Sequence, residues 1–289
     1  MDRPLRIGTR GSPLALVQAH MVADALRAAH GWDEGAIEIV PITTSGDVIQ
    51  GRPLAEIGGK ALWTKELDAC LADGRTDLSV HSMKDVETIR PPIFAIAAML
   101  ARADTRDRLI GAASIAALPE GALVGTSSPR RTAQLRARRP DLRTVSIRGN
   151  VQTRLAKIAR GEADATLLAA AGLERLGIEA GAPLDLLPAP AQGAIGVEMA
   201  AGREDLRDLL AAIDHRPTHE AVSAERAFLA ALGGDCHSAV AALAEGGVLR
   251  AEILSADGRE VQAAEGEPEE LAGRLLAQAS PTLRATFGR

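Results

Sequence analysis

The residues best suited to chemistry follow a short buried strand that we expect at Leu78–His81. The chain continues as Ser82-Met83-Lys84-Asp85-Val86, so a cation and a carboxylate stand next to each other where the strand ends. Folds that alternate strands and helices bind their ligands at this end of a strand. Lys84 and Asp85 therefore indicate a ligand site, and a surface ion pair of little energetic value is the alternative.

The thiol of Cys236 is a second candidate, because it lies in the glycine turn Gly233-Gly234-Asp235-Cys236-His237. Structural cysteines are usually buried in apolar helices or strands, as we expect for Cys70. Cys236 is therefore the better candidate for a reactive thiol. Its neighbour His237 is poorly placed to act as its general base, which argues against a protease-like site.

A third feature is a basic segment, residues 125–160, which carries a net charge of +9 and leaves −14 for the rest of the chain. A basic stripe in an acidic protein indicates an anionic ligand, and arginine pairs with carboxylates through two parallel hydrogen bonds. A solvated helix face is the alternative for Arg136, Arg138 and Arg139. The basic residues are Arg130, Arg131, Arg136, Arg138, Arg139, Arg143, Arg148, Arg154, Lys157 and Arg160, and Asp141 is the only acid.

The composition argues against several other classes of protein. The chain has only five aromatic residues, too few for a stacking platform that binds single-stranded nucleic acid. Its six histidines and two cysteines lack zinc-type spacing, so we expect no metal site. The longest apolar stretch has nine residues, Ile93–Ala101, whereas a membrane helix needs about 20. The N-terminus lacks the apolar segment of a signal peptide, so we expect a reducing cytosol.

The elements that must position these residues alternate between short apolar runs and helical patterns, which is typical of an α/β fold. We expect Ser12 to cap a helix that begins at Pro13 and has one apolar face. That face would carry Leu14, Val17, Met21, Val22 and Leu26. The other elements expected in this part are strands at Leu5–Gly8, Ile37–Ile42, Leu78–His81 and Ile93–Leu100 and a helix at Leu62–Leu71.

The pattern then restarts with a strand at Ala122–Thr126 and a helix opened by Ser127-Ser128-Pro129. Further expected elements are a strand at Thr144–Arg148, a helix at Val151–Ala159, a strand at Ala165–Ala170 ending in a turn at Gly172, and a proline-rich linker around Pro183, Pro188 and Pro190. A third, smaller domain should begin with a helix at Thr218–Leu232, followed by strands at Val240–Leu243 and Leu249–Leu254 and a helix near Glu269–Gln278.

Two segments share the order strand, Gly-Thr, Ser-Pro, helix: Gly8-Thr9-Arg10-Gly11-Ser12-Pro13 and Gly125-Thr126-Ser127-Ser128-Pro129. This repetition predicts two similar domains. Each would present the free N–H groups of a helix N-terminus to an anion. If the two helix ends face each other, they form a cleft for a polyanion.

Several motifs occur together in one order along the chain, from about residue 5 to residue 240. They are Leu5-Arg6-Ile7-Gly8-Thr9-Arg10-Gly11-Ser12-Pro13-Leu14-Ala15, Gly58-Gly59-Lys60, His81-Ser82-Met83-Lys84-Asp85-Val86, Gly125-Thr126-Ser127-Ser128, Arg130-Arg131, Arg148-Gly149-Asn150-Val151 and Gln192-Gly193. In these motifs and their order the chain resembles the porphobilinogen deaminase, or hydroxymethylbilane synthase, family.

The resemblance implies an α/β fold with two type II periplasmic-binding-protein-like domains around a cleft and a small α+β C-terminal domain. The implied boundaries are 1–98 with 194–213, then 103–189, then 216–289 with the cofactor cysteine. The implied protein is a cytoplasmic, monomeric transferase of porphyrin, tetrapyrrole and heme biosynthesis. It joins four porphobilinogen molecules head to tail with loss of ammonia and releases hydroxymethylbilane by hydrolysis. The chain grows on a dipyrromethane cofactor attached through a thioether to Cys236.

The resemblance also implies roles for individual residues. Asp85 matches the catalytic carboxylate, which would hydrogen-bond pyrrole N–H groups, protonate the leaving amine and stabilise the azafulvene cation. Every pyrrole carries an acetate and a propionate, a ligand that suits a basic segment. The implied cofactor-binding residues are Cys236, Lys84, Thr126, Ser128, Arg130, Arg131 and Arg148. The implied substrate-binding residues are Arg10, Ser12, Lys60, Ser127, Arg148, Arg154, Arg175 and Gln192.

Two other functions stay open on the sequence. A non-catalytic protein that binds a small anion would use the same two-lobed fold and would leave Cys236 without a cofactor. A nucleic-acid-binding protein would use the basic segment and would bind with a steep dependence on salt. The scarcity of aromatic residues argues against the latter, and we expect neither nucleic acid nor a membrane as a partner.

Overall fold

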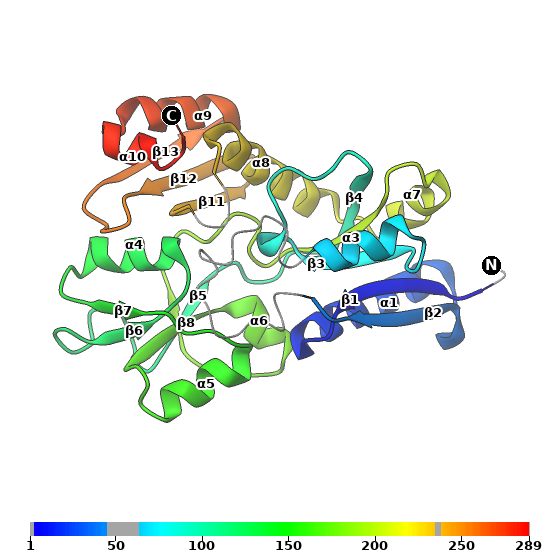
Figure 1. Ribbon diagram of the computed structural model, residues 1–289, viewed down its shortest axis with the longest axis horizontal. Helices are drawn as coiled ribbons and strands as arrows, with labels where there is room; N and C mark the ends of the chain where they lie inside the picture. Colours follow the sequence, from blue (N-terminus) through cyan, green and yellow to red (C-terminus); the bar gives the residue numbers. More distant parts are fainter. Residues whose placement is uncertain (1–2, 45–63, 235–237, 289) are drawn as a thin grey trace. The chain divides into compact units, whose positions relative to one another are not determined.

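The structure is a computed structural model that describes residues 3–44, 64–234 and 238–288. The chain divides into two compact units (Figure 1). Unit 1 comprises Met1–Ala103 and Gly193–Glu220, and unit 2 comprises Asp104–Gln192 and Ala221–Arg289. Among the described residues, no helix has both the length and the apolar character needed to cross a membrane.

Unit 1 is built on a five-stranded sheet with the strand order β2-β1-β3-β10-β4. Strand β1 runs parallel to β2 and β3, and β10 runs antiparallel to β3 and β4. Its elements are β1 (Leu5–Arg10), α1 (Pro13–His30), the 3₁₀ helix η1 (Glu34–Ala36), β2 (Ile37–Ile42), α3 (Lys65–Ala72), β3 (Leu78–Ser82), the 3₁₀ helix η2 (Met83–Asp85), β4 (Phe94–Met99), β10 (Ile195–Ala200), α7 (Glu204–Ala211) and the start of α8 (Arg216–Leu232).

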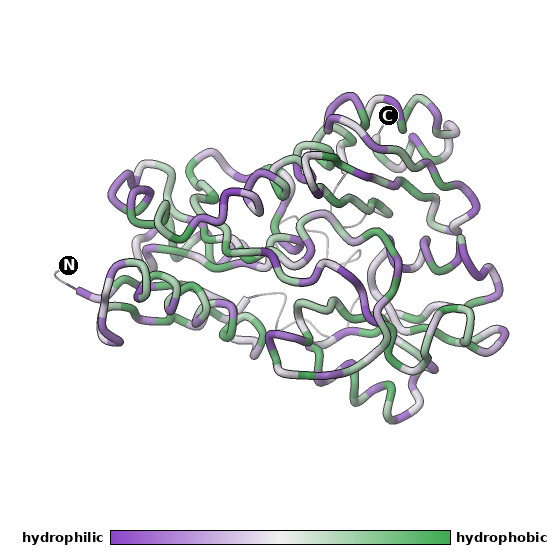
Figure 2. Tube along the Cα trace, turned by 180° about the vertical axis from the view of Figure 1, so that it is seen from behind, coloured by the Kyte–Doolittle hydropathy of each residue, from purple (hydrophilic) through white to green (hydrophobic). Residues whose placement is uncertain are grey.

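The two faces of this sheet differ in character. Successive side chains of a strand point to opposite faces, so Leu78 and Val80 lie on one face and His81 on the other. The first face packs in one hydrophobic core with helices α1 and α7. The other face holds buried polar groups, because His81 and Glu198 of β10 are hydrogen-bonded there. The helices carry hydrophilic as well as hydrophobic residues along their length, as helices that cover a sheet do (Figure 2).

Unit 2 contains a second five-stranded sheet, with the order β7-β6-β8-β5-β9. Strand β6 runs parallel to β7 and β8, whereas β5 runs antiparallel to β8 and β9. Its elements are β5 (Asp107–Ile110), β6 (Leu123–Gly125), α4 (Pro129–Arg138), β7 (Arg143–Val145), α5 (Val151–Ala159), β8 (Ala165–Ala169), α6 (Ala170–Arg175) and β9 (Ala182–Leu184).

The two five-stranded sheets have the same plan. In each sheet three neighbouring strands are parallel, and the strand that comes first among these three in the sequence, β1 or β6, lies in the middle. An antiparallel strand follows next to the trio, and then an edge strand. The antiparallel position is filled by β10 in unit 1 and by β5 in unit 2. The chain thus leaves the first lobe through β4 and β5 and returns to it through β9 and β10, which supports the two similar lobes predicted from the repeated motif.

Unit 2 also contains a three-stranded antiparallel sheet in the order β11-β12-β13. This sheet packs with α8, α9 and α10 in a hydrophobic core of its own. The elements are β11 (Val240–Glu245), β12 (Val248–Leu254), β13 (Val261–Gly266), α9 (Pro268–Gln278) and α10 (Pro281–Ala285). The α+β character expected for the C-terminal part is therefore confirmed.

Several local predictions were wrong. Met21, expected on the apolar face of α1, is 38% exposed, and alanines such as Ala19 and Ala23 are buried instead because they let the helix pack close to the sheet. Gly172, expected in a turn, lies inside α6. Pro183, expected in a linker, lies in the edge strand β9, where the missing N–H does not face a neighbouring strand. Strand β7 ends at Val145, three residues earlier than expected.

Candidate active site

A pocket in unit 1, lined by both polar and apolar residues, lies where β1 and β3 end. The two strands are parallel neighbours, so their carboxyl ends meet at one edge of the sheet, the usual ligand position of such folds. The pocket brings together Arg10, Ser12 and Asp85, three of the predicted site residues. Its full lining is Arg10, Ser12, Leu14, Ala15, Gln18, Thr64, Val80, His81, Ser82, Asp85 and Val86.

Asp85 ends the short 3₁₀ helix η2, which follows β3 directly. Its side chain is exposed and makes no hydrogen bond or ion pair with any residue in the described ranges. The backbone around it is held, because Met83 is 1% exposed and the N–H of Val86 donates to the Met83 carbonyl at 3.3 Å. Asp85 therefore offers a carboxylate to the pocket from a fixed turn. Lys84 lies on the same turn but is not one of the described residues that line the pocket.

Ser12 closes the other side of this pocket as the N-cap of α1. Its hydroxyl accepts a hydrogen bond from the N–H of Ala15 at 3.3 Å, as the sequence predicted for a Ser-Pro helix start. Gln18 follows on the same helix and is 3% exposed. The amide of Gln18 donates to the Ser82 hydroxyl at 2.8 Å, so it joins α1 to the end of β3. Gln18 was not among the predicted site residues, although a polar residue among the apolar positions of one helix face indicates a buried polar contact.

Unit 2 repeats this arrangement at the ends of β6 and β7, two parallel neighbours. Ser128 caps α4 by accepting from the N–H of Arg131 at 3.4 Å, and Asn150 caps α5 by accepting from the N–H of Thr153 at 2.8 Å. The hydroxyl of Ser127 donates to the carbonyl of Ile147 at 2.9 Å and so joins the two segments. Thr126 is buried, and its hydroxyl accepts from the N–H of Ser128 at 3.2 Å. The N-termini of α4 and α5 therefore lie at the same edge of this sheet.

Arg148 lies between these two helix starts, one residue after Ile147. Its side chain is half-buried, and its Nε is inaccessible and has no hydrogen-bond partner among the described residues. Gly149 follows with φ +110°, and a Cβ there would overlap Thr153, so the chain needs glycine to enter α5 at this point. Arg148 precedes the N-terminus of α5 by three residues, and its Nε lacks a partner within the described ranges, which suits a carboxylate ligand.

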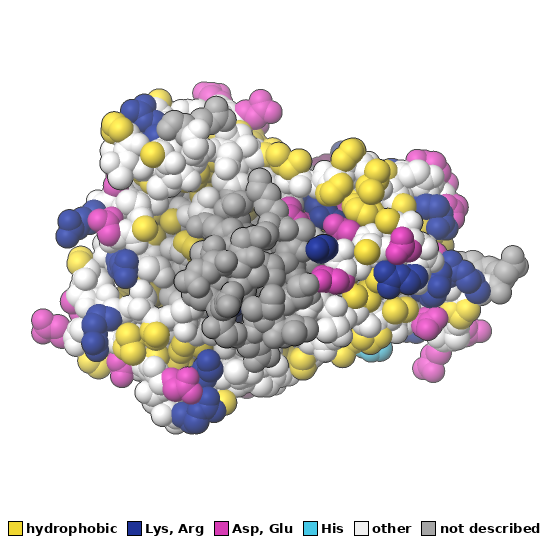
Figure 3. Space-filling view, in the orientation of Figure 1, with side chains coloured by type: hydrophobic (Ala, Val, Ile, Leu, Met, Phe, Trp, Pro, Cys, Tyr) yellow, Lys and Arg dark blue, Asp and Glu magenta, His cyan; other side chains and the backbone are white. Residues whose placement is uncertain are grey.

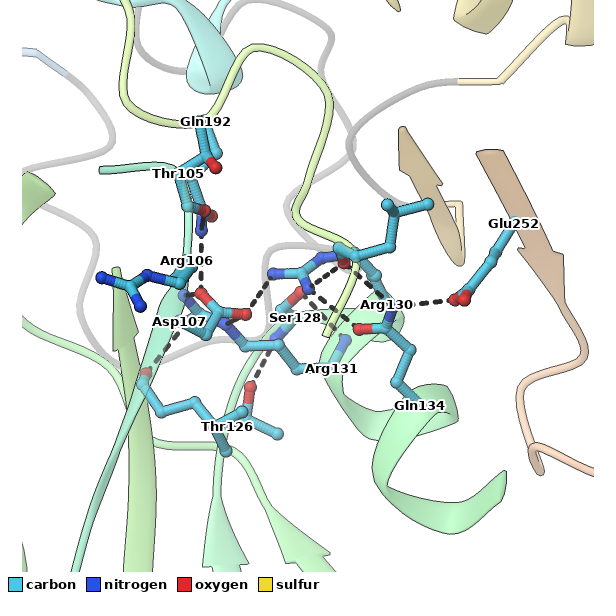
Figure 4. Close-up of polar contacts among 12 residues, drawn as sticks. Thr105, Arg106, Asp107, Thr126, Ser128, Arg130, Arg131, Gln134, Gln192 and Glu252 are labelled. Atoms are coloured by element: carbon cyan, nitrogen blue, oxygen red, sulfur yellow. Dashed lines mark hydrogen bonds and ion pairs between the residues drawn. The ribbon is translucent and has the colours of Figure 1, made fainter. Parts of the chain in front are cut away.

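Arg130 and Arg131 occupy a different environment, in the interior of unit 2 (Figure 4). Both pair with Asp107, which is fully buried: Arg130 Nη2 lies 2.8 Å and Arg131 Nη2 lies 2.7 Å from its carboxylate oxygens. The amide of Gln192 also donates to Asp107, at 2.9 Å. Burial alone would raise the pKa of Asp107, but the two guanidinium groups outweigh that effect and hold its pKa far below the ordinary value.

The same network reaches the C-terminal sheet (Figure 4). Arg130 Nη1 donates to Gln134 Oε1 at 2.9 Å, and Gln134 Nε2 donates to Glu252 of β12, also at 2.9 Å. Arg130 Nε is buried and has no partner among the described residues. This network was not predicted, since Asp107 and Glu252 lie far from the arginines in the sequence.

The basic segment 125–160 therefore does not form one patch of +9, and that interpretation was wrong. The net charge of the segment leaves out acidic residues that lie elsewhere in the sequence but contact its arginines in the folded unit. Asp107 neutralises part of the charge of Arg130 and Arg131, and Glu162 pairs with Arg160 at 2.6 Å. Arg139 pairs with Asp141 and donates to loop carbonyls. On the face seen in Figure 3, basic side chains stand in separate groups, several beside acidic ones.

The remaining predicted residues have separate positions. Arg154, on the first turn of α5, donates from Nε to the carbonyl of Gly149 at 2.9 Å. Arg175 ends α6 and is half-buried, and burial lowers its pKa below the ordinary value. Lys60 and Cys236 lie outside the described residues.

Comparisons with known proteins settle the family. Two family models match the chain: "Porphobilinogen deaminase, dipyromethane cofactor binding domain" over residues 5–208 and "Porphobilinogen deaminase, C-terminal domain" over residues 219–279. The chain belongs to the porphobilinogen deaminase family. The resemblance seen in the sequence is thereby confirmed, and with it the enzyme class and the dipyrromethane cofactor that the family carries.

Curated porphobilinogen deaminases agree with this assignment. The one from Sphingopyxis alaskensis is 60% identical over 99% of this chain and 97% of its own length. The one from Paracoccus denitrificans is 54% identical over 91% of this chain and 88% of its own length. Among solved structures, the chain resembles a nutrient-binding protein from Burkholderia cenocepacia bound to methionine, with 14% identity, a TM-score of 0.46, and coverage of 75% of this chain and 94% of that one.

The described residues fit the cofactor that this family carries. Dipyrromethane has carboxylates, which need cationic donors, and pyrrole N–H groups, which need an acceptor. The buried Nε atoms of Arg148 and Arg130 lack partners within the described ranges, and the exposed carboxylate of Asp85 is an acceptor. Unit 1 therefore supplies an acceptor for pyrrole N–H groups and unit 2 supplies donors for carboxylates, the two kinds of partner that the group requires.

Proposed function

We propose that the Asp85 pocket and the helix starts of unit 2 serve a transferase reaction on porphobilinogen. Four substrate molecules are joined head to tail, one ammonia leaves at each addition, and hydroxymethylbilane is released by hydrolysis. The primer is a dipyrromethane attached through a thioether to Cys236. The observation that carries the proposal is the exposed carboxylate of Asp85, which lines a pocket with Arg10 and Ser12 and has no partner among the described residues.

Asp85 acts at the carbon that loses its amine. The protonated carboxyl gives its proton to the leaving amine, and the C–N bond breaks as ammonia departs. The carboxylate that remains lies next to the positive charge now spread over the substrate pyrrole and lowers the energy of that cation. It also accepts hydrogen bonds from pyrrole N–H groups. The cation is consumed when the terminal pyrrole carbon of the growing chain forms a C–C bond with it and gives up its proton, and a proton returned to Asp85 restores the acid. One carboxylate on a fixed turn thus serves every addition.

The arginines and helix starts hold the carboxylates of substrate and cofactor. Arg148, Thr126, Ser128, Arg130, Arg131 and Lys84 are assigned to the cofactor, which supplies the nucleophilic pyrrole carbon that starts the chain. Arg10, Ser12, Lys60, Ser127, Arg148, Arg154, Arg175 and Gln192 are assigned to the substrate. Arg130 and Arg131 already share Asp107, so they contribute rigid donors rather than free charge.

The stoichiometry of ammonia release tests this function. Incubation with porphobilinogen should yield four molecules of ammonia for each linear tetrapyrrole released. Saturable binding of porphobilinogen without ammonia would contradict the proposal and favour the non-catalytic anion-binding protein. The proposal also includes a cytoplasmic monomer with no nucleic-acid or membrane partner, and the mass of the native protein in solution tests the monomer.

Arg148→Leu should block elongation or cofactor assembly. A substrate carboxylate left unpaired in a partly buried site costs about 2 kcal/mol or more, so kcat/KM should fall by about 30-fold or more. Steady-state kinetics on porphobilinogen measure the effect.

Arg143→Leu is the matched control, since Arg143 is exposed in the same segment and donates to the carbonyl of Gly121. Its kinetics should stay close to those of the native enzyme. Unchanged kinetics in Arg148→Leu would remove Arg148 from the site.

A further inference from the structure

A buried ionic cluster lies behind the Asp85 pocket, on the polar face of the unit 1 sheet. Its centre is Arg90, whose side chain is only 8% exposed. Three carboxylates surround the guanidinium: Asp68 of α3, Glu198 of β10, and Glu87, two residues after Asp85. Thr64, the N-cap residue of α3 and part of the pocket lining, completes the cluster.

All five N–H donors of Arg90 have acceptors in this cluster. Nε and Nη2 bind the two carboxylate oxygens of Glu198 at 2.8 and 2.9 Å, a bidentate pair. Nη2 also binds Asp68 at 2.6 Å. Nη1 binds Glu87 at 2.7 Å and Thr64 at 3.4 Å. A lysine in this place could not make these bonds, because it has one nitrogen and no planar fork.

Two carboxylates of the cluster, Glu87 and Glu198, form hydrogen bonds with residues that line the pocket. Glu87 accepts from Arg90 and, at 2.6 Å, from the Thr64 hydroxyl, so the chain is fixed two residues beyond Asp85. Glu198, which is fully buried, accepts from His81 Nε2 at 3.1 Å, and His81 lines the pocket. On the other side of Asp85, Met83 packs over Gly196 of β10, where a Cβ would overlap its sulfur.

We propose that Arg90 is a positioning residue for Asp85: by fixing Glu87 and Glu198 it holds the turn and the pocket wall on which the reaction of Asp85 depends. Asp85 has no side-chain partner among the described residues, so its location is set by the backbone on either side. The buried Met83 fixes one side, and the Arg90–Glu87 pair fixes the other. This inference rests on the proposed role of Asp85.

The charge balance of the cluster provides a test that separates positioning from stability. Among the described residues, three carboxylates contact this guanidinium, and burial together with the neighbouring carboxylates raises the pKa of Asp68. Glu87→Gln removes the repulsion between Glu87 and Asp68, which should offset the weaker pairing with Arg90 and keep the melting temperature near the native value. The neutral amide oxygen accepts more weakly from Arg90, and the amide NH2 cannot accept from the Thr64 hydroxyl, so the substitution should loosen the turn. Stability and activity are therefore expected to respond differently.

The experiment compares four variants of the cofactor-loaded enzyme with the native protein. Glu87→Gln should keep the native Tm, leave KM within about twofold, and lower kcat by about tenfold or more, since misplacing a catalytic group by about 1 Å costs up to about 100-fold. Arg90→Lys keeps the charge but loses the fork, so its kcat should fall as well. Ile37→Val, in the hydrophobic core of the same unit, is the stability control and should lower Tm without changing kcat.

Loss of kcat in Glu87→Gln at the native Tm supports the positioning role. A kcat within twofold of the native value in both Glu87→Gln and Arg90→Lys overturns it. Asp85→Asn, measured in parallel, separates this inference from the proposed function. If Asp85→Asn is inactive while the other two variants are normal, only the positioning role fails. If Asp85→Asn is active, the proposed role of Asp85 fails and the positioning role fails with it.

Discussion

Asp85→Asn is expected to lower kcat by about 10³-fold or more while the protein stays folded. General acid catalysis contributes about 10²–10⁴-fold, and an amide cannot give up a proton to the leaving amine. An amide also carries no negative charge to stabilise the substrate cation. The loss should appear in kcat, because the missing interactions belong to the transition state. Ammonia release under saturating porphobilinogen measures it.

The structure explains why this substitution should spare the fold. Asn has the shape of Asp, and the Asp85 side chain is exposed and makes no bond with a described residue. Thermal unfolding of the variant should therefore match that of the native protein. Asp73→Asn, at an exposed aspartate that pairs with Arg75 in the same unit, is the control and should keep full activity. If Asp85→Asn retains most of the native turnover, the catalytic role is refuted.

Asp107→Asn is expected to destabilise the protein by about 3–5 kcal/mol, the usual effect of removing one partner from a buried ion pair. Asp107 is the carboxylate shared by Arg130 and Arg131, which are 3% and 6% exposed. An amide in its place leaves two guanidinium groups in the interior without a counter-charge. The free energy of unfolding, from urea titration, measures the effect.

Asp205→Asn is the matched control for this prediction. Asp205 lies 2.6 Å from Arg203, a distance close to those in the buried network, but both side chains are exposed. Exposed pairs contribute about 0–1 kcal/mol, so the control should unfold almost like the native protein. Equal effects of the two substitutions would mean that burial does not strengthen the Asp107 network.

The pH dependence of stability follows from the direction of the same pKa shift. The pKa of Asp107 is lower in the folded protein than in the unfolded chain, where it is about 4. Its contribution is therefore complete above about pH 5 and declines as the pH falls below about 4. The stability difference between the native protein and Asp107→Asn should be constant at neutral pH and shrink in acid. A difference that does not change between pH 7 and pH 3 would contradict this assignment.

Much of the fold could be predicted from the sequence because local signals were clear. The Ser-Pro pairs at residues 12–13 and 128–129 mark two helix starts, and the structure has a serine N-cap at each. The repeated strand, Gly-Thr, Ser-Pro, helix order predicted two similar lobes, and the two sheets share one strand order. These features depend on neighbours in the chain, which a sequence displays directly.

What was missed depends on residues that are distant in the sequence. Strand β5 is short and contains a buried aspartate, Asp107, so its pattern is not that of an apolar strand. Its charge is compensated by arginines more than 20 positions later, and Arg90 meets Glu198 across 108 positions. A charged residue within an apolar strand, such as Glu198 in Ile195–Ala200, is the one local sign that a buried partner exists.

The same reason explains the error over the basic segment. A net charge of +9 over 36 consecutive residues counts only neighbours along the chain. In the folded unit, Asp107 and Glu162 bring negative charge from outside the segment. Arg148 differs from Arg130 and Arg131, because its buried Nε has no hydrogen-bond partner among the described residues and no carboxylate from outside the segment pairs with it there. Its role in binding stays a prediction.

The intact mass of the denatured protein, with peptide mapping around Cys236, tests the central claim most directly. We expect a mass that exceeds that of the chain by two porphobilinogen-derived pyrrole units, with the added mass on the peptide that contains Cys236. An unmodified chain that gains this mass after incubation with porphobilinogen would be the apo-enzyme and would agree with the account. A chain that stays unmodified after that incubation would contradict it.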